Sequence, residues 1–294
     1  MDSKTVKKSV RPRLPNWIRV KAHAGEGRNS IQNLVSSLGL HTVCQSAKCP
    51  NIGECWHKRT ATFMILGKTC TRNCRFCAVE GGKPETPNTE EPDNIALAVE
   101  KMGLKYVVIT CVTRDDLSDG GAGHFVKVIN AIRKRSLTEV KIEVLTSDFD
   151  GNLSSLRTVL DAKPTVFNHN IETVERLSND IRKKATYRAS LLVLKNAYEV
   201  SDSKIPIKSG LMVGMGERDD EVEQTIIDLY KNGVSILTIG QYLPPSYTHW
   251  PLERYVHPET FKKWDDFAKD IGIKHVSSAP LVRSSYHAEE LIEF

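Results

Sequence analysis

The stretch "ATFMILGKTCTRNCRFCAVEGG", residues 61–82, joins a short apolar run to a loop that holds three cysteines within eight positions. The apolar run, residues 61–67, has the length and composition of a buried strand. Cys70, Cys74 and Cys77 follow it directly. In folds built from parallel strands, the loops at the carboxyl ends of the strands carry the active site. The stretch therefore predicts a strand that ends in a metal-binding loop.

Five further apolar runs rich in β-branched residues follow this one, and segments with helical spacing separate them. The six predicted strands span residues 61–67, 105–112, 140–146, 164–170, 207–214 and 234–242, and the six predicted helices span residues 92–103, 122–136, 152–162, 171–178, 187–201 and 219–233. Apolar runs joined by helices indicate a parallel sheet, and the chain carries no dinucleotide-binding fingerprint. We expect an α/β fold, a partial (β/α)6 TIM-like barrel with N-terminal and C-terminal extensions.

The expected division of the chain follows from this alternation. Residues 1–58 form an N-terminal extension that carries a second cysteine triplet, residues 59–277 form the barrel, and residues 278–294 form a C-terminal segment. Hydrophobic residues make up 40% of the 294-residue chain and charged residues 26%, which is close to the globular average and disfavours a disordered or fibrous protein.

The N-terminus is basic but lacks the apolar middle of a secretory signal, and no stretch is apolar enough to span a membrane. We expect a cytoplasmic protein without a membrane partner, a short transit peptide being the alternative. Residues 1–21 hold seven Lys or Arg and one Asp, so the rest of the chain is close to neutral. A solvated tail is the common explanation for such a run, and no nucleic-acid motif accompanies it.

Cys44, Cys49 and Cys55 form the second triplet. A disulfide framework is disfavoured because the chain is large, lacks a secretion signal and has an odd number of cysteines. Zinc requires four ligands, and His41 or His57 would complete this triplet, whereas the triplet at Cys70 has no such neighbour. An iron–sulfur cube held by three thiolates leaves one iron open to another ligand, so we favour clusters over zinc at both triplets.

The spacing Cys70-x3-Cys74-x2-Cys77, with Phe76 before the last cysteine, resembles the signature of the radical S-adenosylmethionine superfamily. That resemblance implies a [4Fe-4S] cluster whose open iron binds S-adenosylmethionine. An electron from this cluster would cleave S-adenosylmethionine and give a 5′-deoxyadenosyl radical. The motif alone leaves many reactions open. A non-catalytic iron–sulfur protein that transfers electrons is the alternative from another class.

The motifs "CQSAKCPNIGEC", "TRDDLSDGG", "NHNIETV", "LMVGMGE", "QYLPPS" and "RSSYHA" extend the likeness from about residue 12 to the end, and they resemble the lipoyl synthase family. The resemblance implies two [4Fe-4S] clusters and insertion of two sulfur atoms, drawn from the auxiliary cluster, at C6 and C8 of an octanoyl chain on a lysine of a carrier domain. It assigns Cys44, Cys49, Cys55 and a serine of the C-terminal motif to the auxiliary cluster. That serine is Ser285, with Ser284 as the alternative.

The remaining expectations concern ligands and partners. The candidate contacts to S-adenosylmethionine are Phe76, Asn168, Asn170 and Arg188. For Arg188, an ion pair with a neighbouring Asp or Glu is the simpler explanation. Cys111 is interpreted as a buried free thiol. The expected partners are an octanoylated carrier domain, an electron donor such as flavodoxin or ferredoxin, and a cluster-repair protein. A related superfamily enzyme that acts on a free small molecule is the nearest alternative.

Overall fold

The computed structural model describes residues 13–19, 26–57, 60–286 and 288–292. Its main sheet has the strand order β1-β2-β5-β6-β7-β8-β9-β10, and all neighbours from β2 onward pair in parallel. The parallel strands are β2 (Thr62–Ile65), β5 (Tyr106–Cys111), β6 (Lys141–Leu145), β7 (Val166–Asn168), β8 (Ile207–Val213), β9 (Val234–Gln241) and β10 (His275–Ser278). The short strand β1 (His41–Thr42) pairs antiparallel with β2 at one edge.

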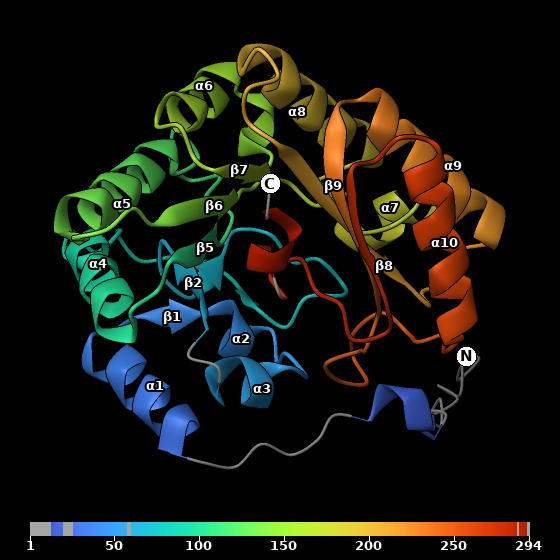
Figure 1. The fold of residues 1–294 in the computed structure, drawn as a ribbon, viewed down its shortest axis with the longest axis horizontal. Helices are drawn as coiled ribbons and strands as arrows, with labels where there is room; N and C mark the ends of the chain where they lie inside the picture. The colour runs from blue at the N-terminus through green and yellow to red at the C-terminus, as the bar shows by residue number, and fades with distance from the viewer. Residues whose placement is uncertain (1–12, 20–25, 58–59, 287, 293–294) are drawn as a thin grey trace, which may run out of the picture.

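Helices surround the sheet on its outer side, and the strands curve around a central space (Figure 1). The helices are α4 (Glu91–Met102), α5 (Ala122–Arg135), α6 (Leu153–Asp161), α7 (Glu175–Arg182), α8 (Tyr187–Val200), α9 (Asp219–Lys231) and α10 (Pro258–Asp270). In the described residues β1 and β10 lie at opposite ends of the strand order and do not pair, so the barrel is open. The expected partial barrel is confirmed.

All six predicted strands and all six predicted helices are present, but the alternation continues beyond them. Helix α10 and strand β10 add a seventh unit that the apolar runs did not predict. Strand β10, "HVSS", holds a single large apolar residue, Val276, because this edge strand is only half-buried. Helix α10 buries Phe261, Trp264 and Ala268 at helical spacing. The domain boundaries at 58/59 and 277/278 stay a prediction.

Local signals in the sequence explain where the helices begin and end. Helix α4 has Pro92 in its first turn and ends at Gly103, whose φ of 66° is the left-handed conformation that favours glycine. Helix α6 begins at Asn152, whose side chain accepts hydrogen bonds from the N–H groups of Ser154 and Ser155.

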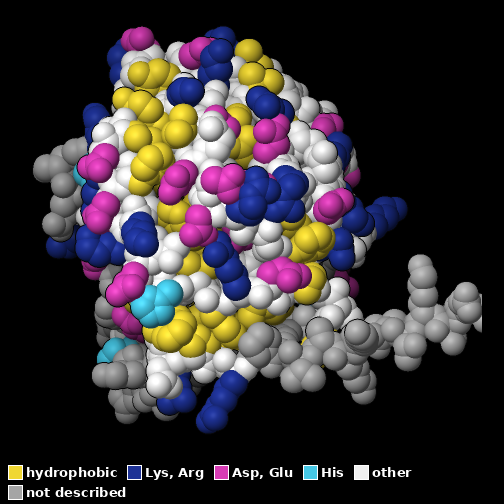
Figure 2. Space-filling view, turned by 90° about the vertical axis from the view of Figure 1, so that its right-hand side faces the viewer, with side chains coloured by type: hydrophobic (Ala, Val, Ile, Leu, Met, Phe, Trp, Pro, Cys, Tyr) yellow, Lys and Arg dark blue, Asp and Glu magenta, His cyan; other side chains and the backbone are white. Residues whose placement is uncertain are grey.

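The outer surface over α9 and α10 carries interspersed basic and acidic side chains (Figure 2). Exposed pairs such as Arg218 with Asp220 (3.0 Å) and Lys262 with Asp266 (2.7 Å) account for part of this pattern. Such pairs contribute little to stability and keep the helix exteriors solvated. No helix in the described part of the chain combines the length and apolar character that crossing a bilayer requires. Most of the basic arm expected at residues 1–21 lies outside the described residues.

The two ends of the chain meet at the barrel. The N-terminal helices α1 (Glu26–Ser37), α2 (Val43–Ser46) and α3 (Ile52–His57) lie beside β1, and the C-terminal segment after β10 enters the central space with the 3-10 helix η3 (Ala288–Ile292) (Figure 1). The side chain of Asn51 donates a hydrogen bond to the carbonyl of Leu281 (2.7 Å). The Tyr286 hydroxyl donates to Glu54 (3.0 Å).

Two glycines on adjacent strands let the C-terminal segment approach the barrel wall. A Cβ at Gly240 in β9 would collide with the carbonyl of Val282. A Cβ at Gly210 in β8 would lie 2.7 Å from both Ser284 Oγ and Asn170 Oδ1. Larger residues at these two positions would push the C-terminal segment out of the barrel.

Gly240→Ala should therefore destabilise the fold by about 1–3 kcal/mol, because the new methyl group overpacks a backbone contact. Urea unfolding measures the loss, and limited proteolysis should release the C-terminal segment earlier than in the parent chain. Gly82→Ala is the matched control, since its methyl group would meet only Thr69 Cγ2 at 3.3 Å. Equal protease resistance of the Gly240→Ala variant and the control would contradict the argument.

Candidate active site

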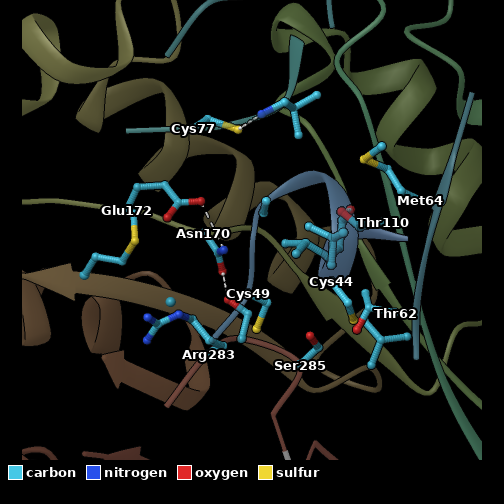
Figure 3. A pocket seen from close by; sticks show the side chains of 18 of the residues that line it. Cys44, Cys49, Thr62, Met64, Cys77, Thr110, Asn170, Glu172, Arg283 and Ser285 are labelled. Atoms are coloured by element: carbon cyan, nitrogen blue, oxygen red, sulfur yellow. Dashed lines mark hydrogen bonds between the residues drawn. The ribbon is translucent and has the colours of Figure 1, made fainter. Parts of the chain in front are cut away.

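A cavity of about 520 Å³ lies inside the barrel, and all three parts of the chain line it. All seven cysteines contribute to its wall, as do both serines of the C-terminal motif: Cys44, Cys49, Cys55, Cys70, Cys74, Cys77, Cys111, Ser284 and Ser285. In the view of Figure 3, Ser285 lies between Cys49 and Cys44, and Cys77 lies across the cavity. The fold thus brings both cysteine triplets to one enclosed space.

The loop of Cys70, Cys74 and Cys77 follows β2 and is closed by its own backbone. Strands β3 (Thr69–Cys70) and β4 (Glu80–Gly81) pair in parallel at its base. The N–H of Gly82 donates to the carbonyl of Cys70 (2.9 Å), and the N–H of Cys77 donates to the carbonyl of Cys74 (3.1 Å). The three thiols therefore lie on a constrained loop at the carboxyl end of the first parallel strand.

Arg72 ties this loop to the carboxyl ends of the next two strands. Its guanidinium donates to Asp115 after β5 (2.7 and 2.9 Å) and to Asp148 after β6 (2.7 Å). Burial disfavours ionisation of Asp148, yet the hydrogen bond and charge of Arg72 outweigh it and lower the pKa of Asp148 to about 2. The same two carboxylates raise the pKa of Arg72 against the effect of burial.

The N-terminal triplet is positioned by two short helices. Thr42 caps α2, its side chain accepting a hydrogen bond from the N–H of Gln45, and Cys44 lies in this helix. The N–H of Cys49 donates to the carbonyl of Cys44 (3.0 Å), and Cys55 lies in α3. Cys49 lies in the turn between the two helices, and all three thiols reach the cavity wall.

Burial in the cavity wall affects the protonation of the thiols. Burial raises the pKa of Cys44 and Cys74 to about 11, and that of Cys55 and Cys77 to about 12. Thiolate is the species that binds iron, so binding must displace these protons. Within the described residues no three His, Cys, Asp or Glu side chains converge on the position of a single ion. In a cube each thiolate binds a different iron, which requires wider spacing around a larger volume.

The two histidines considered as zinc ligands, His41 and His57, are absent from the cavity wall. The thiols of the two triplets and the hydroxyls of the C-terminal serines all reach the cavity wall, which also holds Cys111, Asp148, His169 and Glu172. This donor set, six soft sulfurs and one or two oxygens around an enclosed space, suits two iron–sulfur clusters.

The two C-terminal serines differ in their contacts. The hydroxyl of Ser284 donates to Asn170 Oδ1 across the barrel (2.9 Å), and Asn170 in turn donates to Glu172 (3.1 Å). No hydrogen bond is found for the Ser285 hydroxyl among the described contacts, although Ser285 lines the same cavity. Of the two hydroxyl oxygens, that of Ser285 is therefore the one available to bind a ligand in the cavity.

The predicted contacts to S-adenosylmethionine divide into two groups. Phe76 and Asn170 line the cavity. Asn168 is fully buried below it and donates to Glu143 (2.8 Å), which also accepts from Lys208 (3.0 Å). Arg188 is not brought to the cavity, because its exposed side chain pairs with Glu175 on the outer surface (2.7 Å).

Cys111 lines the cavity as the last residue of β5, and the residue is partly rather than fully buried. Burial raises the pKa of Cys111 to about 12, because the apolar surroundings disfavour the thiolate. Its place at the end of the strand next to β2 explains why it lies beside the loop of Cys70.

Several polar residues of the cavity wall were missed by sequence reasoning, among them Arg72, Asp148, Glu172, Arg182 and Arg283. Glu172 has a φ of 67°, which is uncommon outside glycine, and burial raises the pKa of its carboxyl group. Glu172 stands two positions after Asn170. Side chains two positions apart on an extended strand point to the same side, so this spacing could have predicted that Glu172 faces the cavity. Arg182 is buried in α7 and donates to the carbonyl of Ile171 (3.0 Å) and to Ser190 (2.7 Å).

Comparison with known families and proteins identifies the chain. Residues 64–229 match the radical SAM superfamily, and residues 1–49 match the N-terminal domain of lipoyl synthase of the radical SAM family. Lipoyl synthase of Rubrobacter xylanophilus is 51% identical over 279 residues, covering 95% of this chain and 86% of that one. Lipoyl synthase of Caldanaerobacter subterraneus subsp. tengcongensis is 51% identical over 277 residues, covering 94% and 96%.

Solved structures share the fold at low sequence identity. The FeFe-hydrogenase maturase HydG from Carboxydothermus hydrogenoformans has a TM-score of 0.56 at 15% identity, covering 89% of this chain and 76% of that one. Methylornithine synthase has a TM-score of 0.52 at 13% identity, covering 80% and 65%. These likenesses show a shared fold, and the family follows from the sequence relatives. This chain belongs to the lipoyl synthase family, a family of radical S-adenosylmethionine sulfurtransferases.

Proposed function

We propose that this protein inserts two sulfur atoms at C6 and C8 of an octanoyl chain attached to a lysine of a carrier domain, and that the sulfur comes from an auxiliary [4Fe-4S] cluster. Family membership implies S-adenosylmethionine, one [4Fe-4S] cluster and an octanoylated lipoyl carrier as substrate. One observation carries the finer proposal. Both cysteine triplets and Ser285 line a single cavity, where a radical and a sulfur donor would reach the same chain.

We assign Cys70, Cys74 and Cys77 to the cluster that binds S-adenosylmethionine. Cys44, Cys49, Cys55 and Ser285 are assigned to the auxiliary cluster. When bound, these groups supply the 5′-deoxyadenosyl radical that abstracts hydrogen and the sulfur that replaces it. Phe76 and Asn170 are the proposed contacts to S-adenosylmethionine, because both line the cavity on which the loop of Cys70 opens.

The protein's own contribution is a cavity with an apolar wall. Met64, Val108, Leu145 and Leu211 line it and suit an acyl chain. Excluding water protects a reactive carbon radical from side reactions. The ion pairs of Arg72 hold the loop of the first cluster to two strands, which fixes that loop relative to the rest of the wall.

Ser285 suits a site that must open. Oxygen is a poorer ligand than thiolate for iron in a sulfide cluster, so an iron held by serine is more easily released. The hydrogen bond from Ser284 to Asn170 supports this choice between the two serines, because it occupies the other hydroxyl.

The proposed reaction also defines its partners. Reductive cleavage of S-adenosylmethionine requires a low-potential electron donor such as flavodoxin or ferredoxin. A cluster that surrenders sulfur requires a repair protein to rebuild it. Free thiols as ligands fit a reducing compartment, so we place the reaction in the cytoplasm.

The first test follows the products. The anaerobically reconstituted chain, given S-adenosylmethionine and dithionite, should release 5′-deoxyadenosine, because the first cluster supplies the electron. Mass spectrometry of an octanoylated carrier peptide should show two hydrogens replaced by two sulfurs. Cys55→Ala should keep 5′-deoxyadenosine release and lose sulfur insertion, whereas Cys70→Ala should lose both.

Absence of 5′-deoxyadenosine from the parent chain would instead favour an electron carrier. Release of 5′-deoxyadenosine without a sulfur-containing carrier peptide would favour a related enzyme with a free small-molecule substrate.

The second test separates the two serines. Ser285→Ala should lower the iron and sulfide content toward that of one cluster, because the auxiliary cluster loses its fourth ligand. Ser284→Ala should keep the content of two clusters, because its hydroxyl already bonds Asn170. Iron and sulfide analysis of both anaerobic proteins measures this. The opposite pattern would assign the ligand to Ser284.

The third test concerns the loop that Arg72 holds. The pKa of Asp148 lies at about 2 rather than 3.8, so its charge stabilises the fold above pH 4, and this contribution is lost as the pH falls toward 2. The parent chain should exceed Asp148→Asn in stability by about 2 kcal/mol at pH 6, with the difference shrinking toward pH 3. Urea unfolding of the metal-free proteins measures it. A difference independent of pH would refute the role of the ion pair.

A further inference from the structure

The turn between strand β2 and the loop of Cys70 contains two consecutive residues in the left-handed conformation. Leu66 has a φ of 69° and Gly67 has a φ of 90°. Glycine adopts this conformation freely, whereas a leucine there is strained and keeps it only where its surroundings enforce it. The chain therefore needs contacts that hold Leu66 where the strand ends and the loop begins.

Leu66 is held at its N–H, at its carbonyl and at its side chain by three different segments. Its N–H donates to Glu91 Oε2 in the first turn of α4 (2.8 Å). Its carbonyl accepts from Arg114 Nη1 after β5 (3.2 Å). Its side chain packs over Gly121, where a Cβ would collide with Leu66 Cδ1. These contacts together account for the left-handed conformation of a buried leucine.

Glu91 is a buried carboxylate that joins helix α5 to this turn. Only 5% of the residue is exposed, and glutamate is seldom buried unless it is paired. The same Oε2 that accepts from Leu66 also accepts from Nε2 of His124 in α5 (2.6 Å). Burying a carboxylate is costly, so its hydrogen bonds must serve a purpose. The place of this pair, directly before the cysteine loop, indicates that purpose.

The cysteine loop is anchored on both sides of Cys70. Cys70 follows Leu66 by four positions, and two positions later Arg72 pairs with Asp115 and Asp148. The hold on Leu66 is therefore the anchor on the side of strand β2. Without it Leu66 would relax to an unstrained conformation, and the start of the loop would shift relative to the barrel.

We propose that Glu91 is a positioning residue for the loop of Cys70. Supported by His124, it keeps the turn at Leu66 left-handed, and this fixes where the loop begins and how it presents its thiols to a cluster. Glu91 is not among the described residues that line the cavity, so it acts through Leu66. This inference rests on the proposed function, because it takes the assignment of this loop to a cluster as given.

Three variants at one position separate the hydrogen bond of Glu91 from its charge. Glu91→Gln loses the charge and keeps an oxygen that accepts from the N–H of Leu66. Glu91→Asp keeps the charge but is one methylene too short to reach Leu66, and Glu91→Ala loses both. Asp93→Ala is the matched control, because Asp93 is an exposed acidic residue in the first turn of the same helix.

The first measurement uses the metal-free full-length chain, so it does not depend on a cluster. The amide of Leu66 should exchange hydrogen about 10-fold to 100-fold faster in Glu91→Ala and Glu91→Asp than in the parent, because it loses a hydrogen bond to a charged group. Glu91→Gln and Asp93→Ala should stay within a few-fold of the parent. Exchange in strand β8 is the internal control for global unfolding and should not change.

The second measurement follows iron in two backgrounds that each keep one cysteine triplet. The first background carries Cys44→Ala, Cys49→Ala and Cys55→Ala, and the second carries Cys70→Ala, Cys74→Ala and Cys77→Ala. In the first background, Glu91→Ala and Glu91→Asp should lose iron to a chelator about 10-fold faster, because a group that orients the metal ligands is gone. In the second background the same two changes should leave the rate of iron loss unaltered.

Four results would overturn the inference. Faster exchange at Leu66 with unchanged iron loss from the first background would make Glu91 a residue of the fold alone. Equal acceleration of iron loss in both backgrounds, or a Glu91→Asp chain that fails to fold, would lead to the same conclusion. Glu91→Gln that behaves like Glu91→Ala would show that the hydrogen bond is not what matters. A first background that binds no iron with Glu91 in place would instead refute the assignment of the loop, on which this inference depends.

Discussion

The close packing of the C-terminal segment against the inner wall of the barrel is the constraint on which the site depends. Gly210 and Gly240 provide the space for it, since side chains there would collide with Ser284 and with the carbonyl of Val282. Once the segment is in place, Asn51 and Glu54 of the N-terminal extension bond to it. Residues about 230 positions apart in the sequence then share one cavity, and the cysteine-bearing helices α2 and α3 are held against the open side of the barrel.

Charge inside this cavity is arranged in two different ways. Around the loop of Cys70, Cys74 and Cys77, the ion pairs of Arg72 with Asp115 and Asp148 are complete within the protein itself. This loop is therefore fixed before any ligand arrives. Around the N-terminal triplet, no ion pair is found for Arg283 among the described residues, and burial raises the pKa of Cys44 and Cys55 to about 11 and about 12.

Much of the fold was predictable because parallel strands that are buried on both faces leave clear apolar runs. All six predicted strands were present for this reason. Strand β10 was missed because an edge strand such as "HVSS" is only half-buried and has no apolar run to recognise. Among the candidate contacts, Asn170 reaches the cavity while Asn168 turns below it to Glu143, and Arg188 faces solvent. The end of a strand predicts that a side chain lies near the site, but strand length and twist decide which one enters it.

By itself, the sequence determined the chemistry available to this protein: two groups of three thiols, an aromatic residue within the second group, and a pair of serines near the C-terminus. These depend on residue type and local spacing, which are written directly in the chain. Only the tertiary structure decided that both groups line one cavity, that the Ser284 hydroxyl donates to Asn170, and that Arg283 lines the same cavity. Those relations join residues distant in the sequence, and they arise because the barrel and its two extensions must pack together to bury their apolar surfaces.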